Sequence, residues 1–411
     1  MSWREQTKDN PHFCIMAFDH MHVNTNGNVN LCCVADWQYP IRADAHGTDL
    51  QTLWTGDAYK QIRQDMLDGK AVKQCEGCYK IDREGGGSDR TVHNRHSKVP
   101  DEQELNIDTG NEQHGPLWVD WRPGRFCNFG CRMCFVGVSS TIADEHKANP
   151  ALQDVTGESW FDVKDWIEDP VLFESAKSLL PSLKTLKIAG GEPFFMPGVI
   201  KLLRHCIDEK QTHLHLDITT NGSRMQGKVL RWLESFAEVD IQFSIDGIGY
   251  TNDYIRYNAD WNALDSAYKQ YLTMPVRTHI LSTVQAYNAY DLVNIIKYWQ
   301  DHGSNNNLIF NFVDSPHDLS IDILPLEDRI QISKDIKAVT LDWEPQCLEQ
   351  SRLNALHIKL NKAEPNDISV LRHKFAKRTA AYDALRHQDV SLVNSRLGEL
   401  TAQWLTTTTL S

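Results

Sequence analysis

The sequence predicts an α/β fold built around a parallel sheet. Between about residues 116 and 313, short apolar runs rich in β-branched residues alternate with longer amphipathic stretches of helical length. Six such strand–helix units follow one another, and parallel strands joined by right-handed helical crossovers are the usual outcome of this alternation. The pattern fits either an open doubly wound sheet or part of a β/α barrel. In both folds, functional residues gather at the carboxyl ends of the strands.

The expected strands are short, and the expected helices carry apolar residues at three-to-four spacing. The strands are Leu117–Trp121, Thr185–Ala189, Leu214–Thr219, Asp240–Ile245, Arg277–Val284 and Leu308–Phe312. The helices between them include Gly198–Glu209, Gly227–Phe236, Trp261–Leu272 and Tyr290–His302. Beyond about residue 325 the pattern is helical only, and its clearest segments are Leu371–Leu385 and Val390–Trp404.

Two polar segments predict domain boundaries. One runs from about residue 98 to 115, and the other is Ser315-Pro316-His317-Asp318. We therefore expect a cysteine-rich N-terminal domain over 1–110, an α/β core over 111–315 and a helical C-terminal extension over 316–411.

The composition excludes several classes of protein. The 411 residues include 42 Lys and Arg against 55 Asp and Glu, a formal charge of −13, so sequence-independent binding to nucleic acid is not expected. No apolar run approaches the ~18–20 residues of a membrane span. The first ten residues lack the apolar core of a secretory signal, so we expect a cytoplasmic protein with reduced thiols.

The cysteines are concentrated in the first third of the chain. Eight of the ten lie before residue 135, in two tight groups. A disulfide framework would spread pairs over the fold, whereas tight groups in a reducing compartment indicate metal ligands. The ten are Cys14, Cys32, Cys33, Cys75, Cys78, Cys127, Cys131, Cys134, Cys206 and Cys347.

The second group forms a Cys-x3-Cys-x2-Cys motif directly after the first strand of the α/β core. Cys127, Cys131 and Cys134 can hold three irons of a cubane [4Fe–4S] cluster and leave the fourth iron open to another ligand. Structural zinc takes four protein ligands, usually in paired Cys-x2-Cys knuckles, so three cysteines with this spacing fit zinc poorly.

This motif is similar to the signature of the radical S-adenosylmethionine (SAM) superfamily. The resemblance implies a partial (β/α)6 barrel in which SAM chelates the open iron. One electron from the cluster then cleaves SAM to methionine and a 5′-deoxyadenosyl radical, which abstracts hydrogen from a substrate. It also implies catalytic roles for Cys127, Cys131 and Cys134. The residues that the resemblance assigns to SAM binding are Met133, the motif Gly190-Gly191-Glu192-Pro193, Asn221, Ser244, Asp246 and Arg256.

The first cysteine group consists of Cys14, Cys32, Cys75 and Cys78. Four cysteines can saturate a [4Fe–4S] cluster or close a zinc site, and spacing alone does not choose between them. The turn sequence Asn24–Asn28 predicts a small β-hairpin that brings Cys14 and Cys32 together.

The spacing Cys-x12-Gly-x4-Cys followed by Cys-x2-Cys resembles the auxiliary-cluster modules called SPASM and twitch. The resemblance implies a small α+β domain with one auxiliary [4Fe–4S] cluster held by these four cysteines. In the families that carry the module it usually follows the barrel, whereas here it precedes it.

The remaining candidates have weaker signals. We expect Cys33, Cys206 and Cys347 to be bystanders, although Cys347 could also donate hydrogen or contact substrate. A histidine near Cys14 is an alternative ligand, and polar residues near the strand ends could act in acid–base catalysis. These residues are His12, His20 and His22 in the first case, and Asp217, Gln285 and Asn311 in the second.

The resemblance implies oxidative or crosslinking modification of a peptide or protein side chain. One alternative is dehydrogenation of a small metabolite such as a sugar alcohol, and another is a non-catalytic, zinc-stabilised binding protein. A radical SAM enzyme would also need an electron donor such as flavodoxin or ferredoxin.

Overall fold

The computed structural model describes residues 2–83, 87–97, 99–101, 104–110, 115–224, 227–302, 307–313, 315–341 and 348–406. The chain divides into two compact units, which we describe separately. The first unit contains Met1–Phe126, Asp162–Ile218 and Gln226–Val239, and the second contains Cys127–Phe161, Thr219–Met225 and Asp240–Ser411.

Among the described residues, eight strands form one sheet in the order β10-β9-β7-β6-β5-β3-β1-β2. Their bounds are β1 His20–Val23, β2 Val29–Asn30, β3 Trp118–Trp121, β5 Thr185–Ile188, β6 His215–Thr220, β7 Glu238–Ser244, β9 Arg277–Val284 and β10 Leu308–Phe312. The pairs β1–β3, β3–β5, β5–β6, β7–β9 and β9–β10 are parallel, whereas β1–β2 is antiparallel. All six expected strands are present, which confirms the mostly parallel α/β architecture of a partial barrel.

Helices cover the sheet, and further helices form the C-terminal part of the chain. In the first unit they are α1 Trp3–Thr7, α2 Met16–Asp19, α3 Leu50–Trp54, α4 Asp57–Leu67, α5 Glu76–Arg83, α6 Asp89–His96, α9 Pro170–Leu179, α10 Pro197–Asp208 and α11 Gly227–Leu233. In the second they are α7 Ser140–Ala148, α8 Leu152–Thr156, α12 Tyr250–Ile255, α13 Trp261–Tyr271, α14 Leu292–His302, α15 Leu326–Val339, α16 Leu348–Leu360, α17 Ile368–Arg386 and α18 Ser395–Thr406.

Alternating burial gives the first unit's strands two distinct faces. Leu186 and Ile188 of β5 are fully buried, as are Leu216 and Ile218 of β6. The residues between them are only half-buried, because successive strand side chains point to opposite faces. Polar side chains such as Lys187 and Asp217 therefore share the face opposite to the apolar layer.

The N-terminal segment adds to the same sheet. β1 pairs with β2 through the turn at Gly27, which confirms the expected hairpin, and the φ of +79° at Gly27 is one that glycine adopts without strain. On its other edge β1 pairs in parallel with β3, from His20 opposite Trp118 to Val23 opposite Trp121. The cysteine-rich segment is therefore joined to the barrel sheet by backbone hydrogen bonds.

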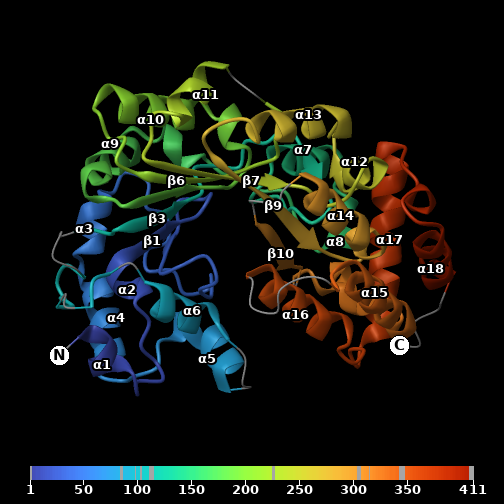
Figure 1. Ribbon diagram of the computed structural model, residues 1–411, viewed down its shortest axis with the longest axis horizontal. Helices are drawn as coiled ribbons and strands as arrows, with labels where there is room; N and C mark the ends of the chain where they lie inside the picture. The colour runs from blue at the N-terminus through green and yellow to red at the C-terminus, as the bar shows by residue number, and fades with distance from the viewer. Residues whose placement is uncertain are drawn as a thin grey trace. The chain divides into compact units, whose positions relative to one another are not determined.

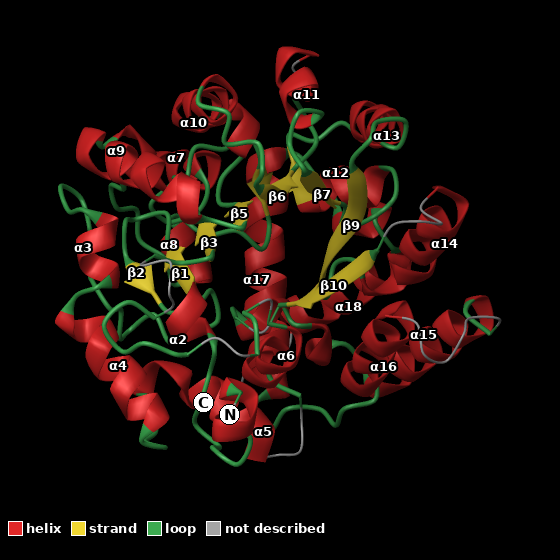
Figure 2. Cartoon of the chain, turned by 60° about the vertical axis from the view of Figure 1, so that its left-hand side comes forward, coloured by secondary structure: helices red, strands yellow, loops and turns green. Residues whose placement is uncertain are grey.

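In the second unit, β7, β9 and β10 are followed by the helical C-terminal segment. β9 and β10 lie side by side in Figure 2, and α17 and α18 pack against each other in Figure 1. The expected helical extension is confirmed. Parts of the first expected boundary segment, residues 98, 102–103 and 111–114, lie outside the described residues. No helix in the described ranges is both long and apolar enough to cross a membrane.

Candidate functional site

Three thiols meet on one short loop of the second unit. Cys131 lies in β4 (Gly130–Cys131), which pairs with β8 (Arg256–Tyr257) so that Cys131 faces Arg256. The backbone N–H of Cys134 donates to the carbonyl of Cys131 at 3.0 Å, and the Cys127 carbonyl accepts from the Thr141 hydroxyl at 2.8 Å. These bonds fix the loop, so that Cys134 interacts electrostatically with both other thiols.

The electrostatics of the loop favour a thiolate. The pKa of Cys131 is lowered, first by the hydrogen bond from the Cys134 thiol and also by the nearby charge of Arg256, which outweigh its burial. The pKa of Cys134 is raised well above its ordinary value by the same hydrogen bond and by burial. Three converging thiols beside a fixed cation fit a cluster that takes three thiolate ligands.

A buried ion pair positions that cation. Arg256 Nη2 lies 2.7 Å from Asp246 Oδ2, and Arg256 Nη1 donates toward Cys131 Sγ at 3.8 Å. Asp246 is fully buried, and its Oδ1 accepts the backbone N–H of Thr283 at 2.6 Å. Ser244 ends β7 two residues before Asp246. The structure therefore brings Asp246 and Arg256 to the cysteine loop, and their expected contacts with SAM stay predictions.

Asn221 also lies against the loop. Its side-chain Nδ2 donates to Asn128 Oδ1 at 2.9 Å and reaches Cys127 Sγ at 4.0 Å. The next residue, Gly222, has φ +71°, and a Cβ there would lie 2.5 Å from Leu264 Cδ1. Glycine therefore allows the turn that directs Asn221 toward the loop.

The motif Gly190–Pro193 lies in the first unit and packs against the chain just before Cys127. A Cβ on Gly191 would lie 2.2 Å from the Phe126 carbonyl oxygen, and the Glu192 N–H donates to that oxygen at 2.8 Å. Glu192 is fully buried and accepts the Phe194 N–H at 3.1 Å, at the start of the short 3-10 helix Pro193–Phe195. The two glycines thus permit close backbone packing, and the expected contacts of this motif and of half-buried Met133 with SAM stay predictions.

Sequence reasoning missed Arg132, which ties the cysteine loop to the C-terminal helix. Its side chain is fully buried, and Nη2 donates to Asp383 Oδ1 of α17 at 2.6 Å and to Gln388 Oε1 at 2.9 Å. The guanidinium also lies 3.7 Å from the centre of the Tyr254 ring. An arginine between two cysteine ligands was visible in the sequence, but nothing identified a partner about 250 residues away.

The other four cysteines line one cavity in the first unit. Cys14 precedes α2 and Cys32 follows β2, whereas Cys75 ends the 3-10 helix Lys73–Cys75 and Cys78 lies in α5. Burial raises the pKa of all four thiols, that of Cys75 to about 12, and mutual repulsion adds to the effect at Cys14. One buried and three half-buried thiols, all with raised pKa values, fit a positively charged metal group that stabilises thiolates.

The expected bystanders and alternative ligands occupy other positions. Cys33 is exposed, Cys206 is buried in α10, and Cys347 lies outside the described residues. Each candidate histidine has its own partner. His12 Nδ1 contacts the Gly69 carbonyl at 2.7 Å, His20 Nδ1 contacts the Leu31 carbonyl at 2.7 Å, and His22 Nδ1 lies 3.4 Å from Asp120 Oδ2.

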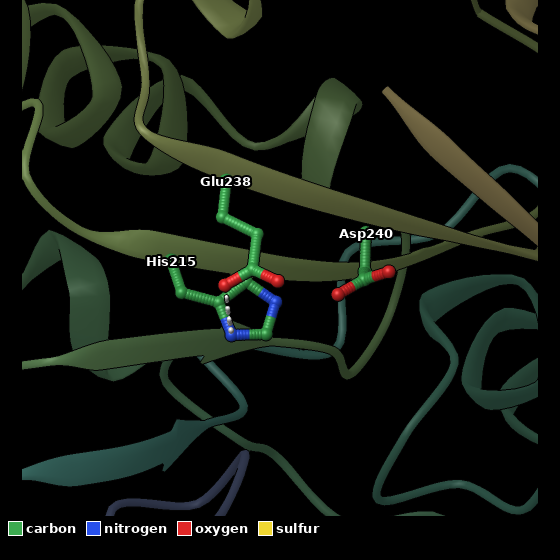
Figure 3. Close-up of side chains that lie close together, drawn as sticks. All are labelled: His215, Glu238 and Asp240. Carbon is green, nitrogen blue, oxygen red and sulfur yellow. Dashed lines mark ion pairs between the residues drawn. The ribbon is translucent and has the colours of Figure 1, made fainter. Parts of the chain in front are cut away.

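Polar side chains follow the half-buried face of the first unit's strands. Lys187 Nζ pairs with Asp217 Oδ2 at 3.4 Å. Figure 3 shows His215 and Glu238 facing each other, with Nδ1 and Oε2 3.7 Å apart. Asp240, also labelled there, belongs to the second unit, where its carboxylate pairs with Arg277 and His279 at 2.5 Å. Many of these charges are therefore already balanced within the protein.

The two other polar candidates differ in setting. Gln285 is fully buried, its N–H donates to Asn288 Oδ1 at 2.9 Å, and its side-chain Nε2 donates to the Thr283 carbonyl at 3.2 Å. Asn311 is exposed on β10. The contacts of Gln285 are those of a residue that closes a turn.

Two family models match the chain. The model of the radical SAM superfamily matches residues 121–310, and the SPASM model, described as an iron-sulfur cluster-binding domain, matches residues 14–79. No curated protein sequence matches the chain.

Solved structures with partial likeness include anSMEcpe with bound AdoMet and Streptococcus suis SuiB bound to S-adenosylmethionine. The anSMEcpe match has 15% identity and a TM-score of 0.41, and covers 60% of this chain and 63% of that one. The SuiB match has 12% identity and a TM-score of 0.40, and covers 74% and 65% respectively. The chain therefore spans just under two thirds of the length of either protein.

Proposed function

Since the chain is a radical SAM protein with a SPASM-type iron–sulfur cluster-binding domain, we propose that it uses a SAM-derived radical to modify a peptide or protein side chain. Its cofactors are a [4Fe–4S] cluster with SAM and an auxiliary iron–sulfur cluster. The proposed modification is oxidation or crosslinking, as the resemblance to enzymes with this module implies.

The observation that carries this proposal is the convergence of Cys127, Cys131 and Cys134 beside Arg256. When bound there, the cluster supplies one electron for the reductive cleavage of SAM. The three thiols are the proposed ligands of that cluster. Asp246 holds Arg256 in place, and a planar guanidinium is suited to bind a carboxylate. The buried surroundings of both residues exclude water from the charged pair.

The proposed SAM contacts extend beyond Arg256. They comprise Met133, Gly190, Gly191, Glu192, Pro193, Asn221, Ser244 and Asp246. For the auxiliary cluster we propose Cys14, Cys32, Cys75 and Cys78, which line one cavity. We also propose the division into an N-terminal domain over 1–110, a core over 111–315 and a C-terminal extension over 316–411. The proposed electron donor is of the flavodoxin or ferredoxin type.

Cleavage of SAM tests the proposal directly. Dithionite-reduced, anaerobically reconstituted protein should release 5′-deoxyadenosine from SAM, and Cys131→Ala should lower this to the level without protein. Cys206→Ala is the matched control, because Cys206 is a buried cysteine of α10 that belongs to neither cysteine group. Wild-type activity in Cys131→Ala would overturn the assignment. If the protein consumed a sugar alcohol and left peptides unmodified, the proposed substrate would be a small metabolite in place of a peptide.

A further inference from the structure

A cavity of about 210 Å³ lies at the amino ends of β3, β5 and β6 in the first unit. We call it the Asp19 pocket. Its walls come from α2, from α6 and the residues that follow it, and from the strand starts at Trp118, Thr185 and His215. At about 30 Å³ per water molecule, it has room for roughly seven water-sized groups. The chain leads to the cysteine loop from the opposite, carboxyl end of β3, so this pocket is separate from that site.

Asp19 is an acidic residue that lines the pocket, and one of its carboxylate oxygens has no hydrogen-bond partner among the described residues. It is only 7% exposed, and its Oδ2 accepts the Ser97 hydroxyl at 3.3 Å. Its Oδ1 has no hydrogen-bond partner among the described residues, and no ion pair joins Asp19 to another described side chain. A buried carboxylate in this state is costly unless a cation or a strong donor reaches it.

Two imidazole rings beside the pocket, those of His20 and His93, do not supply a positive charge at neutral pH. Trp118 lies between His20 and His93, at centroid distances of 4.6 and 5.2 Å. Burial lowers the pKa of His20 to about 3 and also lowers that of His93, so both imidazoles are neutral. Lys184, which is exposed, has only the weakest of the effects on the pKa of Asp19.

The other walls suit an alkyl chain that carries a cation. Met16 and Leu117 are apolar, and the Trp118 indole lines the same pocket. Met16 and His93 also line the four-cysteine cavity. A ligand in the Asp19 pocket would therefore be separated from the proposed auxiliary cluster by a shared wall.

We propose that the Asp19 pocket binds a primary alkylammonium group, which pairs with the Asp19 carboxylate while its chain lies against Met16, Leu117 and Trp118. An anion is disfavoured because it would meet the Asp19 carboxylate, whereas the lysine that lines the pocket, Lys184, is exposed to solvent. The identification of this ammonium as part of the substrate rests on the proposed function, whereas the binding itself does not.

Calorimetric titration with n-butylammonium chloride tests the pocket on anaerobically reconstituted protein at about pH 8. The wild type should bind n-butylammonium and should bind n-butanol and butyrate at least about tenfold more weakly, as expected for the loss of one charge-assisted contact. Asp19→Asn should weaken n-butylammonium binding by a similar factor. Val99→Phe, which fills the pocket without altering Asp19, should also weaken it.

Asp208→Asn is the matched control, since Asp208 is an exposed carboxylate at the end of α10 that pairs with Arg204. Its affinity for n-butylammonium should equal that of the wild type. Equal binding of n-butanol and n-butylammonium, or unchanged affinity in folded Asp19→Asn and Val99→Phe, would overturn the proposal.

Two further probes distinguish the sources of the ammonium. Nα-acetyl-lysine methylamide presents a side-chain ammonium, and leucine methylamide presents an α-ammonium. The probe that binds more tightly identifies the source. If neither probe binds, the proposal is contradicted. Cys131→Ala should bind n-butylammonium like the wild type. In the wild type, absence of 5′-deoxyadenosine release together with binding of n-butylammonium would count against the proposed function alone.

Discussion

At the scale of single residues, the carboxyl of Asp19 combines burial with an oxygen that has no hydrogen-bond partner among the described residues. Burial raises its pKa from 3.8 to about 7, and the Ser97 hydroxyl and Lys184 only partly offset this. The titratable and charged groups that line the same pocket are His93 and His96 from α6, Lys184 before β5, and His215 and Asp217 from β6. The folded state therefore holds the Asp19 proton more tightly than the unfolded chain does.

This shift predicts a pH-dependent gain in stability for Asp19→Asn. The folded state binds more protons than the unfolded state between about pH 4 and pH 7, so the wild type loses stability as the pH rises through that window. The amide does not titrate. Between about pH 5 and pH 8 the stability difference between Asp19→Asn and wild type should move by about 2–3 kcal/mol in favour of the variant.

Denaturant titrations at the two pH values measure this change, with Asp208→Asn as the control for a surface carboxylate. The same difference at both pH values would show that Asp19 does not titrate in this range. Saturating n-butylammonium should reduce the variant's advantage at about pH 8, because the ligand stabilises the folded wild type more than the folded variant.

The grouping of the cysteines could be predicted from sequence alone, since their spacing is local, whereas their role as cluster ligands stays a prediction. Asp246 and Arg256 were also predictable, because they follow one strand closely and the structure brings them to Cys131. Arg132 and Asp19 were not. Their importance depends on burial and on partners from distant segments, such as Asp383 for Arg132 and the start of β3 for Asp19.

At the scale of elements, α17 supports the cysteine loop from outside. Asp383 and Arg386 lie one turn apart on this helix; Asp383 binds Arg132, and Arg386 binds the Glu145 carboxylate of α7 at 2.7 and 2.9 Å. The Arg386 guanidinium also lies over the Tyr257 ring of β8. The helix thus contacts the residues that flank Cys131 and those that follow Cys134, and it helps to fix the three thiols.

Asp383→Ala should selectively weaken the proposed catalytic cluster. It leaves Arg132 buried without its carboxylate, and breaking a buried pair costs about 3–5 kcal/mol. We expect iron to fall from about eight toward about four atoms per chain, with less 5′-deoxyadenosine released. Asp383→Glu should keep more iron and SAM cleavage than Asp383→Ala, because it retains a carboxylate for Arg132. A purely local packing defect would not be relieved by this variant.

Asp335→Ala serves as the control, since Asp335 is an exposed residue of α15 whose carboxylate accepts from Gln331. It should keep about eight iron atoms. Full iron content and full SAM cleavage in Asp383→Ala would show that α17 does not support the loop.

Strand and helix patterns could be predicted because they depend on local periodicity. All six core strands and the two C-terminal helical segments were found near their expected bounds. The parallel pairing of β1 with β3 and the short β4–β8 ladder were not anticipated. Both join segments about 100 residues or more apart, and two to four paired residues give no periodic signal.

At the scale of the whole molecule, the two cysteine groups belong to different compact units. The four-cysteine cavity is built within the first unit, and the three-thiol loop within the second. The charges and contacts that we describe around each group come from its own unit. Removal of one ligand should therefore empty one site and leave the other largely unchanged.

Cys75→Ala tests this independence from the side of the auxiliary site. Without one of its four thiols, the first unit should lose its cluster, and iron should fall from about eight to about four atoms per chain. The remaining cluster should still give the SAM-dependent change in its electron paramagnetic resonance spectrum, and SAM should still be cleaved to 5′-deoxyadenosine. Turnover of the substrate should be lost, if the auxiliary cluster accepts the substrate's electron.

Cys33→Ala is the matched control, because Cys33 is an exposed thiol next to Cys32 in the same segment. It should keep about eight iron atoms per chain and wild-type turnover. Loss of both clusters in Cys75→Ala would show that the two sites depend on each other. Loss of iron in Cys33→Ala, with full iron in Cys75→Ala, would reassign the ligands of the auxiliary cluster.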